Sequence, residues 1–199
     1  MRRVDRPPRA APGAEEARSG VRIRQARPGD ASALRALIAS VYAEERWFVG
    51  DEAPSEGALR SRLEMAEPAW EATFVAESDR SLSGWIEMRR YRVQRLAHVA
   101  TLTVAVDASS RGSGTGRRLL RAGVEWARSV GTLKLRLDVR AGNDAARRLY
   151  EREGFVIEGR ERHQIALANG RYEDNLLMAR WLGDEERSSS PVRLTAPES

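Results

Sequence analysis

Residues 99–120 constrain the fold of this chain more than any other stretch, because a strand, a glycine-rich turn and a helix follow one another there. The segment 99–106 alternates apolar and small polar residues, which predicts a β-strand. Gly112, Gly114 and Gly116 follow it and precede an apolar stripe at helical spacing. Glycines let backbone N–H groups turn inward, and a helix N-terminus carries partial positive charge. The stretch therefore predicts an anion site at the start of a helix.

Three arginines surround this loop. Arg111 stands just before it, and Arg117 and Arg118 lie in the first turn of the predicted helix, where the macrodipole disfavours cations. We interpret this crowding as a sign that a highly charged anion, such as a pyrophosphate, binds there. The P-loop motif does not apply, because Arg117 stands where that motif has lysine, and neither glycine register supplies the third glycine of the dinucleotide motif. From spacing alone, a phosphate site and a plain tight connection both remain open.

Two motifs resemble those of the GCN5-related N-acetyltransferase (GNAT) superfamily. Arg111-x-x-Gly114-x-Gly116 resembles its Q/R-x-x-G-x-G/A motif, which binds the pyrophosphate of acetyl-coenzyme A (acetyl-CoA) in that family. The segment 143–155 resembles its N-x-x-A-x-x-L-Y-x-x-x-G-F motif, and the two motifs stand in the family's order and near its usual spacing. The segment 171–180 resembles the last strand of bacterial members that acetylate small amines or protein N-termini.

The order of the expected elements is that of a mixed α/β (α+β) chain. We expect strands over 21–26, 72–77, 84–93, 99–106, 133–139, 155–167 and 171–182, and helices over 30–45, 55–65, 114–130 and 143–153. Asp30, Ser55 and Asn143 are expected to cap three of the helices, and Gly154 to end the last one. The resemblance implies the GNAT fold, with a mixed, mostly antiparallel sheet of about seven strands, about four flanking helices and a splay between strands 4 and 5.

The two ends of the chain differ from its middle. Residues 1–20 carry Pro, Gly, Ala and charge with few apolar anchors, and we expect a disordered arm there. Residues 184–199 are expected to form a second loose tail. The GNAT domain is therefore expected over residues 21–183, and the last hairpin offers an edge at which two copies could pair as a homodimer.

Composition excludes several classes of protein. The 199 residues include no cysteine, which rules out disulfides, a thiolate nucleophile and cysteine metal sites, and we expect no metal. No apolar run approaches the ~18–20 residues of a membrane span, and the N-terminus lacks the apolar stretch of a secretory signal. A cytoplasmic protein without a membrane partner is the expectation.

The net charge of +5 could suggest nucleic acid. All basic residues except Lys134 are arginine, a bias typical of nucleotide composition, and they are interleaved with Asp and Glu rather than collected in blocks. We therefore expect no nucleic-acid partner.

The resemblance assigns the acetyl-CoA contacts by position. The pantetheine arm would bond to the backbone of Val104, Ala105 and Val106 like an added strand. The phosphates would bind the loop and the helix start, at Arg111, Gly112, Ser113, Gly114, Thr115, Gly116 and Arg117. Asn143 and Ala146 would contact the cofactor from the next helix, and Asn143 is equally well explained as a helix cap.

Acetyl transfer to an amine also requires proton movement. The resemblance gives Tyr150 the role of protonating the leaving sulfur, although a tyrosine on an inner helical face can also be simple core. Glu87 is a candidate general base, acting directly or through water, or a residue of a solvated strand face. His98 has a suitable intrinsic pKa or only packs. Thr101 stands where many relatives have a glutamate, which leaves the base open, with Asp138 and Glu173 as further candidates.

The sequence therefore predicts an enzyme, an N-acetyltransferase that moves an acetyl group from acetyl-CoA to a primary amine by direct attack in a ternary complex. The amine is a small molecule, an amino acid or a peptide N-terminus, and the alternative is a noncatalytic acyl-CoA-binding or regulatory domain. The acceptor is expected to enter over residues 46–54, where Trp47 and Phe48 form a wall or only pack, and over residues 163–172. These segments show no clear acidic cluster.

Overall fold

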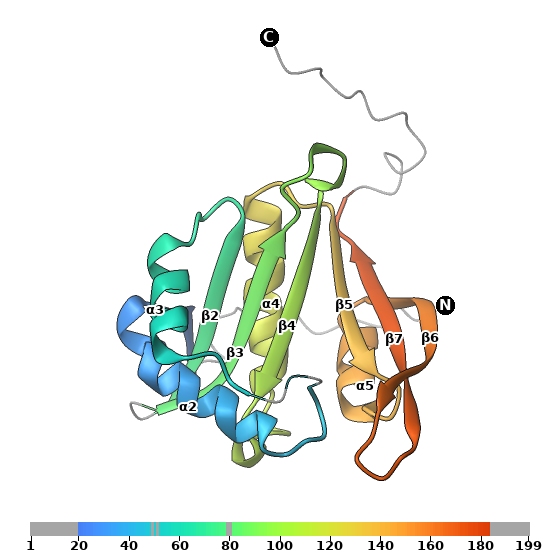
Figure 1. Cartoon of the computed structure of the whole chain (residues 1–199). Coiled ribbons are helices and arrows are strands. Elements are labelled where there is room, and N and C mark those ends of the chain that lie inside the picture. The colour runs from blue at the N-terminus through green and yellow to red at the C-terminus, as the bar shows by residue number, and fades with distance from the viewer. Residues whose placement is uncertain (1–19, 49, 51, 79–80, 184–199) are drawn as a thin grey trace, which may run out of the picture.

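All of the expected strands and helices are present in the computed structural model, which describes residues 20–48, 50, 52–78 and 81–183 (Figure 1). The helices are α2 (Ala31–Tyr42), α3 (Glu56–Met65), α4 (Thr115–Ser129) and α5 (Asp144–Arg152). The strands are β1 (Arg22–Gln25), β2 (Glu71–Ser78), β3 (Ser81–Arg90), β4 (Val99–Val106), β5 (Lys134–Arg140), β6 (Val156–Ala166) and β7 (Tyr172–Trp181). The expected arm, apart from Gly20, and the expected tail lie outside the described residues.

Within the described residues, the seven strands form one sheet in the order β1-β2-β3-β4-β5-β7-β6, and only β4 and β5 are parallel neighbours there. In the described sheet, β4 pairs with β5 over Val99–Thr101 alone, whereas it pairs with β3 as far as Val106. Beyond Thr101 the two parallel strands separate, and Figure 1 shows the wedge between them widening toward their carboxyl ends. The expected mixed sheet with its splay is confirmed.

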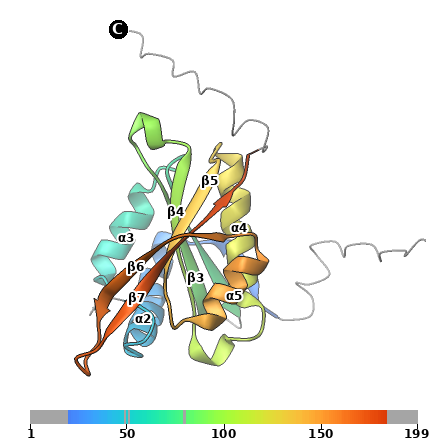
Figure 2. The ribbon, with the colours of Figure 1, turned by 90° about the vertical axis from the view of Figure 1, so that its right-hand side faces the viewer.

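Helices cover both faces of the sheet (Figure 2). On one face, Leu119, Leu120 and Val124 of α4 pack with Ile86 and the inner side chains of β4 and β5. On the other face, α2 and α3 pack over a second apolar cluster that includes Trp85. Adjacent residues of β3 therefore belong to different layers. This alternation decides which side chains of each strand face α2 and α3.

Three of the four predicted helix caps are present. Ser55 Oγ accepts a hydrogen bond from the N–H of Ala58, and Asn143 Oδ1 accepts one from Ala146 at 3.1 Å. Gly154 follows α5 with φ of +83°, in the left-handed region that glycine adopts without strain. No helix among the described residues is long and apolar enough to cross a membrane.

The expected cap at Asp30 is wrong, because its side chain makes no capping hydrogen bond to α2. Its carboxylate instead accepts hydrogen bonds from the Arg24 guanidinium at 2.7 and 2.8 Å and from the N–H of Arg27. Arg24 also bonds Glu77, so this network ties the start of α2 to β1 and β2. The hydrogen bonds from Arg24 hold the pKa of Asp30 below its ordinary value of 3.8.

Asp30→Asn is expected to lower the free energy of unfolding at pH 7 by about 1 kcal/mol, a modest cost because water screens this partly exposed pair. A lowered carboxyl pKa contributes stability above the unfolded value and loses it as the pH falls through the folded value. Urea denaturation of both proteins from pH 7 to pH 3 measures this difference, which should shrink below about pH 3.8. A difference that stays constant over that range would contradict the assignment.

Several expected boundaries are also wrong, including the end of α2 at Tyr42 rather than at residue 45 and the start of β3 at Ser81 rather than at residue 84. β3 ends at Arg90 rather than at residue 93, because the chain turns there toward a short 3₁₀ segment, Gln94–Leu96. Leu133 precedes β5 and is 40% exposed, so it is not part of that strand's buried face.

The last strand in the sheet order, β6, forms an edge of the sheet and exposes Val156 and Ile157. Pairing of two copies along this edge stays a prediction.

Candidate active site

The wedge between β4 and β5 opens into a cavity of about 1030 Å³. Most of the residues predicted to hold the cofactor line it: Val104, Ala105, Val106, Arg111, Gly112, Gly114, Gly116, Arg117, Asn143 and Ala146. Beyond Thr101, no strand in the described sheet pairs with the side of β4 that faces β5. This side of β4 therefore offers backbone groups to an extended ligand.

The glycine loop, residues 111–116, leads directly into α4. Gly112 and Gly114 have φ of +78° and +85°, and Gly114 is the N-cap residue just before α4. Ser113 Oγ donates to the backbone oxygen of Ser110 and lies 2.9 Å from Thr115 Oγ1. Ser113 and Thr115 do not line the cavity, and their side chains hold the loop in shape. The first turn of α4 starts at this cavity. The N–H groups of that turn lack hydrogen-bond acceptors within the helix.

The three arginines around the loop are paired within the protein. Arg111 donates to both carboxylate oxygens of Glu44 and to the backbone oxygen of Val106. The Arg111 guanidinium holds the pKa of Glu44 below its usual range. In the same way, Arg117 donates to Glu153 at 2.6 Å.

Arg118 donates to the backbone oxygen of Val21. The three arginines around the loop therefore all have hydrogen-bond partners within the protein. The expectation that an anion must balance it does not follow from charge alone.

Tyr150 lies on the inner face of α5 and is 6% exposed, with its ring centroid 5.9 Å from that of Phe155. It also lines the cavity. Burial raises the pKa of the Tyr150 phenol above its ordinary value of 10.0. The hydroxyl is therefore protonated at neutral pH and can serve as a proton donor.

Glu87 and His98 do not line this cavity. Glu87 belongs to the face of β3 that α3 covers, where it accepts a hydrogen bond from Arg62 at 2.7 Å. His98 is exposed just before β4, and its backbone oxygen accepts from Leu133 and Lys134 at the paired end of the wedge. The structure thus brings Tyr150 together with the glycine loop and separates both predicted bases from them.

Four polar side chains from β5, β6 and β7 line the cavity and are called the polar wall here: Asp138, Glu161, Gln164 and Asn175. Asp138 belongs to the face of β5 opposite α4, because its neighbours Leu137 and Val139 are buried in the core beside α4. Only Asp138 was among the predicted candidates. Glu173, another candidate, is hydrogen-bonded to Arg140 and to the N–H of Gly142.

Two aromatic residues that follow α2, Trp47 and Phe48, belong to the cavity lining as well. Both also pack: Phe48 stacks on Tyr42 and Trp85 at centroid distances of 5.0 and 6.0 Å. Trp47 Nε1 donates to Glu44 at 2.7 Å. The two predicted roles, cavity wall and packing, therefore coexist.

Residues 38–155 match the model of the acetyltransferase (GNAT) family. The chain belongs to this family. It is 34% identical over 142 residues to the N-alpha-acetyltransferase RimI of Mycobacterium tuberculosis, an alignment covering 71% of this chain and 84% of the relative. It is also 34% identical over 166 residues to a mycothiol acetyltransferase of Thermobispora bispora, which covers 78% of this chain and 52% of that relative. The chain thus spans about half the length of the mycothiol enzyme.

The solved structures agree on the GNAT fold. An acetyltransferase of the GNAT family from Streptococcus pneumoniae superposes with a TM-score of 0.76 at 26% identity, covering 81% of this chain and 99% of that one. Within this GNAT framework, sequence reasoning missed Glu161, Gln164 and Asn175. Glu161 and Gln164 lie in a segment without a motif, and the resemblance of the segment 171–180 assigned no role to Asn175, so only the three-dimensional arrangement shows that they line the cavity.

Proposed function

We propose that this GNAT protein transfers the acetyl group of acetyl-CoA to a primary amine. The observation that carries this proposal is the cavity itself, which connects the glycine loop at the start of α4 with Tyr150 and with the polar wall. A donor bound at the loop and an amine bound at the wall would meet between β4 and β5. The name of the mycobacterial relative, an N-alpha-acetyltransferase, supports an α-amino group as the acceptor.

Different groups of the cavity would hold different parts of acetyl-CoA. The amides of the glycine loop and of α4's first turn would hold the phosphates, and the unpaired side of β4 at Val104–Val106 would hold the pantetheine arm in an extended form. Together these contacts fix the thioester, which makes the attack effectively unimolecular.

Asp138 and Tyr150 would carry the proton transfers. Asp138 accepts one proton from the ammonium group, directly or through water, and the freed amine nitrogen forms a bond to the acetyl carbon. The carbon–sulfur bond then breaks, Tyr150 donates its phenolic proton to the leaving thiolate, and the nitrogen gives up its second proton, which restores the phenol directly or through water. Asp138 replaces Glu87 and His98 in this role because it lines the cavity.

Acetyl-CoA is expected to raise the melting temperature of the full chain by a few degrees, with ADP and added salt as controls. A ligand bound only to the folded state, at about a hundred times its dissociation constant, adds roughly 2.7 kcal/mol. A thiol-release assay with amines then tests transfer. No rise specific to acetyl-CoA would overturn the proposal, and a rise without thiol release from any amine would favour the noncatalytic alternative.

A further inference from the structure

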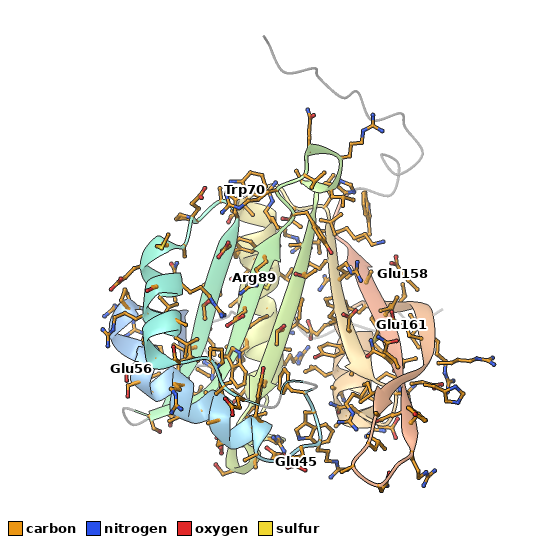
Figure 3. The ribbon with its side chains drawn as sticks, in the orientation of Figure 1. Glu45, Glu56, Trp70, Arg89, Glu158 and Glu161 are labelled. Atoms are coloured by element: carbon orange, nitrogen blue, oxygen red, sulfur yellow. The ribbon has the colours of Figure 1, made fainter. Side chains whose placement is uncertain are left out.

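The polar wall lines the part of the cavity where the amine is proposed to bind, called the acceptor half here. It carries two carboxylates. Asp138 comes from β5, Glu161 and Gln164 from β6, and Asn175 from β7. Figure 3 labels Glu161 on the β6–β7 side of the wedge. The segment 163–172 alone showed no acidic cluster, because these two carboxylates lie outside it, on different strands.

An irregularity in β6 builds this wall. Glu161 pairs with Asn175 and Ile165 with Glu173, so four residue steps on β6 face two on β7. His163 lies inside this bulge with φ of +54°, an uncommon conformation for a residue other than glycine.

Asp174 holds the bulge in place. Its carboxylate accepts hydrogen bonds from the His163 N–H at 2.8 Å and from Arg160 at 2.6 Å. The hydrogen bond from the His163 N–H holds the pKa of Asp174 below its usual range. Bulges of this kind redirect side chains next to functional sites, and here Gln164 and Ile165 both line the cavity.

Glu161 is oriented by its neighbour but keeps one oxygen for a ligand. Asn175 Nδ2 donates to Glu161 Oε2 at 2.8 Å. The described residues provide no hydrogen bond to Oε1. Asp138 has a side chain that is 57% exposed and a loose contact of 3.7 Å to Arg136. Both carboxylates therefore retain negative charge that faces the cavity.

The cations that line the acceptor half are already paired. The Arg140 side chain is 11% exposed and forms two hydrogen-bonding contacts with Glu173. Arg111, in the glycine loop on the donor side, is paired with Glu44. The other lining arginines, Arg117, Arg148 and Arg152, belong to α4 and α5, on the side of the glycine loop. Among the described residues, the acceptor half thus presents carboxylates without a cation to bind an acid group.

We propose that the acceptor is an amine whose amine-bearing carbon carries no acid group, such as the N-terminal residue of a peptide or an amino acid amide, and that Glu161 selects it. This inference rests on the proposed acetyltransferase function. A free amino acid would bring its carboxylate next to Asp138 and Glu161, and like charges repel strongly where water is partly excluded. An amide in the same place is neutral and can donate its N–H to Glu161 or Gln164.

The test compares amino acid amides with the matching free amino acids as acceptors, by thiol release from acetyl-CoA. Rates are compared at equal concentrations of unprotonated amine, because the carboxylate of a free amino acid raises the pKa of its amine. We expect kcat/KM to be at least about 30-fold higher for the amide of each accepted pair. The same pairs are also tested by melting with CoA present, so a preference is measured even for pairs without turnover.

Glu161→Gln removes the charge and keeps an oxygen for Asn175. It should raise KM for amides about 10-fold, leave kcat within about twofold and reduce the preference for amides over acids about 10-fold. Glu158→Gln is the matched control, because Glu158 lies on the same strand (Figure 3), pairs with Lys134 and does not line the cavity. It should change none of these values.

The outcomes separate the two proposals. Equal rates, equal melting shifts or a preference for free amino acids would overturn this inference while acetyl-CoA binding and thiol release still support the enzyme. An unchanged preference in Glu161→Gln would overturn the role of Glu161. If acetyl-CoA does not specifically raise the melting temperature of the unmodified chain, the proposed acetyltransferase function itself is overturned.

Discussion

Replacing Tyr150 by phenylalanine is expected to lower kcat about 100-fold and to change the dissociation constant of acetyl-CoA by less than about threefold. The ring keeps its buried place beside Phe155, 5.9 Å between centroids, so the change removes only the hydroxyl. That hydroxyl is protonated at neutral pH even at its ordinary pKa of 10.0, which burial raises further, so its proton is present when the thiolate leaves. Thiol release under saturating acetyl-CoA measures kcat, and calorimetry measures binding.

Tyr91→Phe provides the matched control for Tyr150. Tyr91 also carries a phenol, which accepts a hydrogen bond from Arg136 at 3.4 Å, but it does not line the cavity. Its kcat should equal that of the unmodified protein. Equal losses of kcat and acetyl-CoA affinity in Tyr150→Phe would make Tyr150 a packing residue, and an unchanged kcat would remove it from the reaction.

The fold was predictable because short stretches of sequence determine its main features. The alternation of 99–106 and the glycines that follow predict a strand, a loop and a helix, and the structure has β4, the glycine loop and α4 there. Ser55 and Asn143 cap their helices through bonds to residues three positions away. Interactions over such short distances depend only on local sequence.

Side-chain partners across the sheet were not predictable in the same way. Arg111 pairs with Glu44, 67 residues away, and Arg117 with Glu153, 36 residues away. The sequence shows the crowded arginines but not the carboxylates that the fold brings to them. Local charge alone therefore predicted an external anion, although groups of the protein itself pair with these arginines.

The candidate bases show a second limit of the sequence. Alternation predicts that Glu87 and Trp85 share one face of β3, but not that α3 covers that face and supplies Arg62. Glu161 lies just before the bulge of β6 at His163 and Gln164 lies within it, and no glycine or proline marks that bulge in the sequence. The donor half of the site follows from local motifs, whereas the acceptor half depends on tertiary structure.

Gly114→Val is expected to weaken acetyl-CoA binding at least about 100-fold, because the side chain would stand at the start of α4 where the phosphates are proposed to bind. Gly114 has φ of +85° and lines the cavity, with open space around the position of a Cβ atom. Because the left-handed region costs an L-residue about 1–2 kcal/mol, and a β-branched one more, the variant will also be less stable. Loss of binding therefore has to be separated from loss of stability.

Gly131→Val makes that separation, because Gly131 lies just after the other end of α4 with φ of +73° and the same open surroundings. It carries a similar backbone strain but does not line the cavity. Both variants should lose a similar amount of free energy of unfolding in urea, while only Gly114→Val loses the acetyl-CoA-dependent rise in melting temperature. If both variants keep that rise, the glycine loop does not bind the donor. If both lose it, the effect of Gly114→Val comes from strain in α4 and not from a blocked phosphate site.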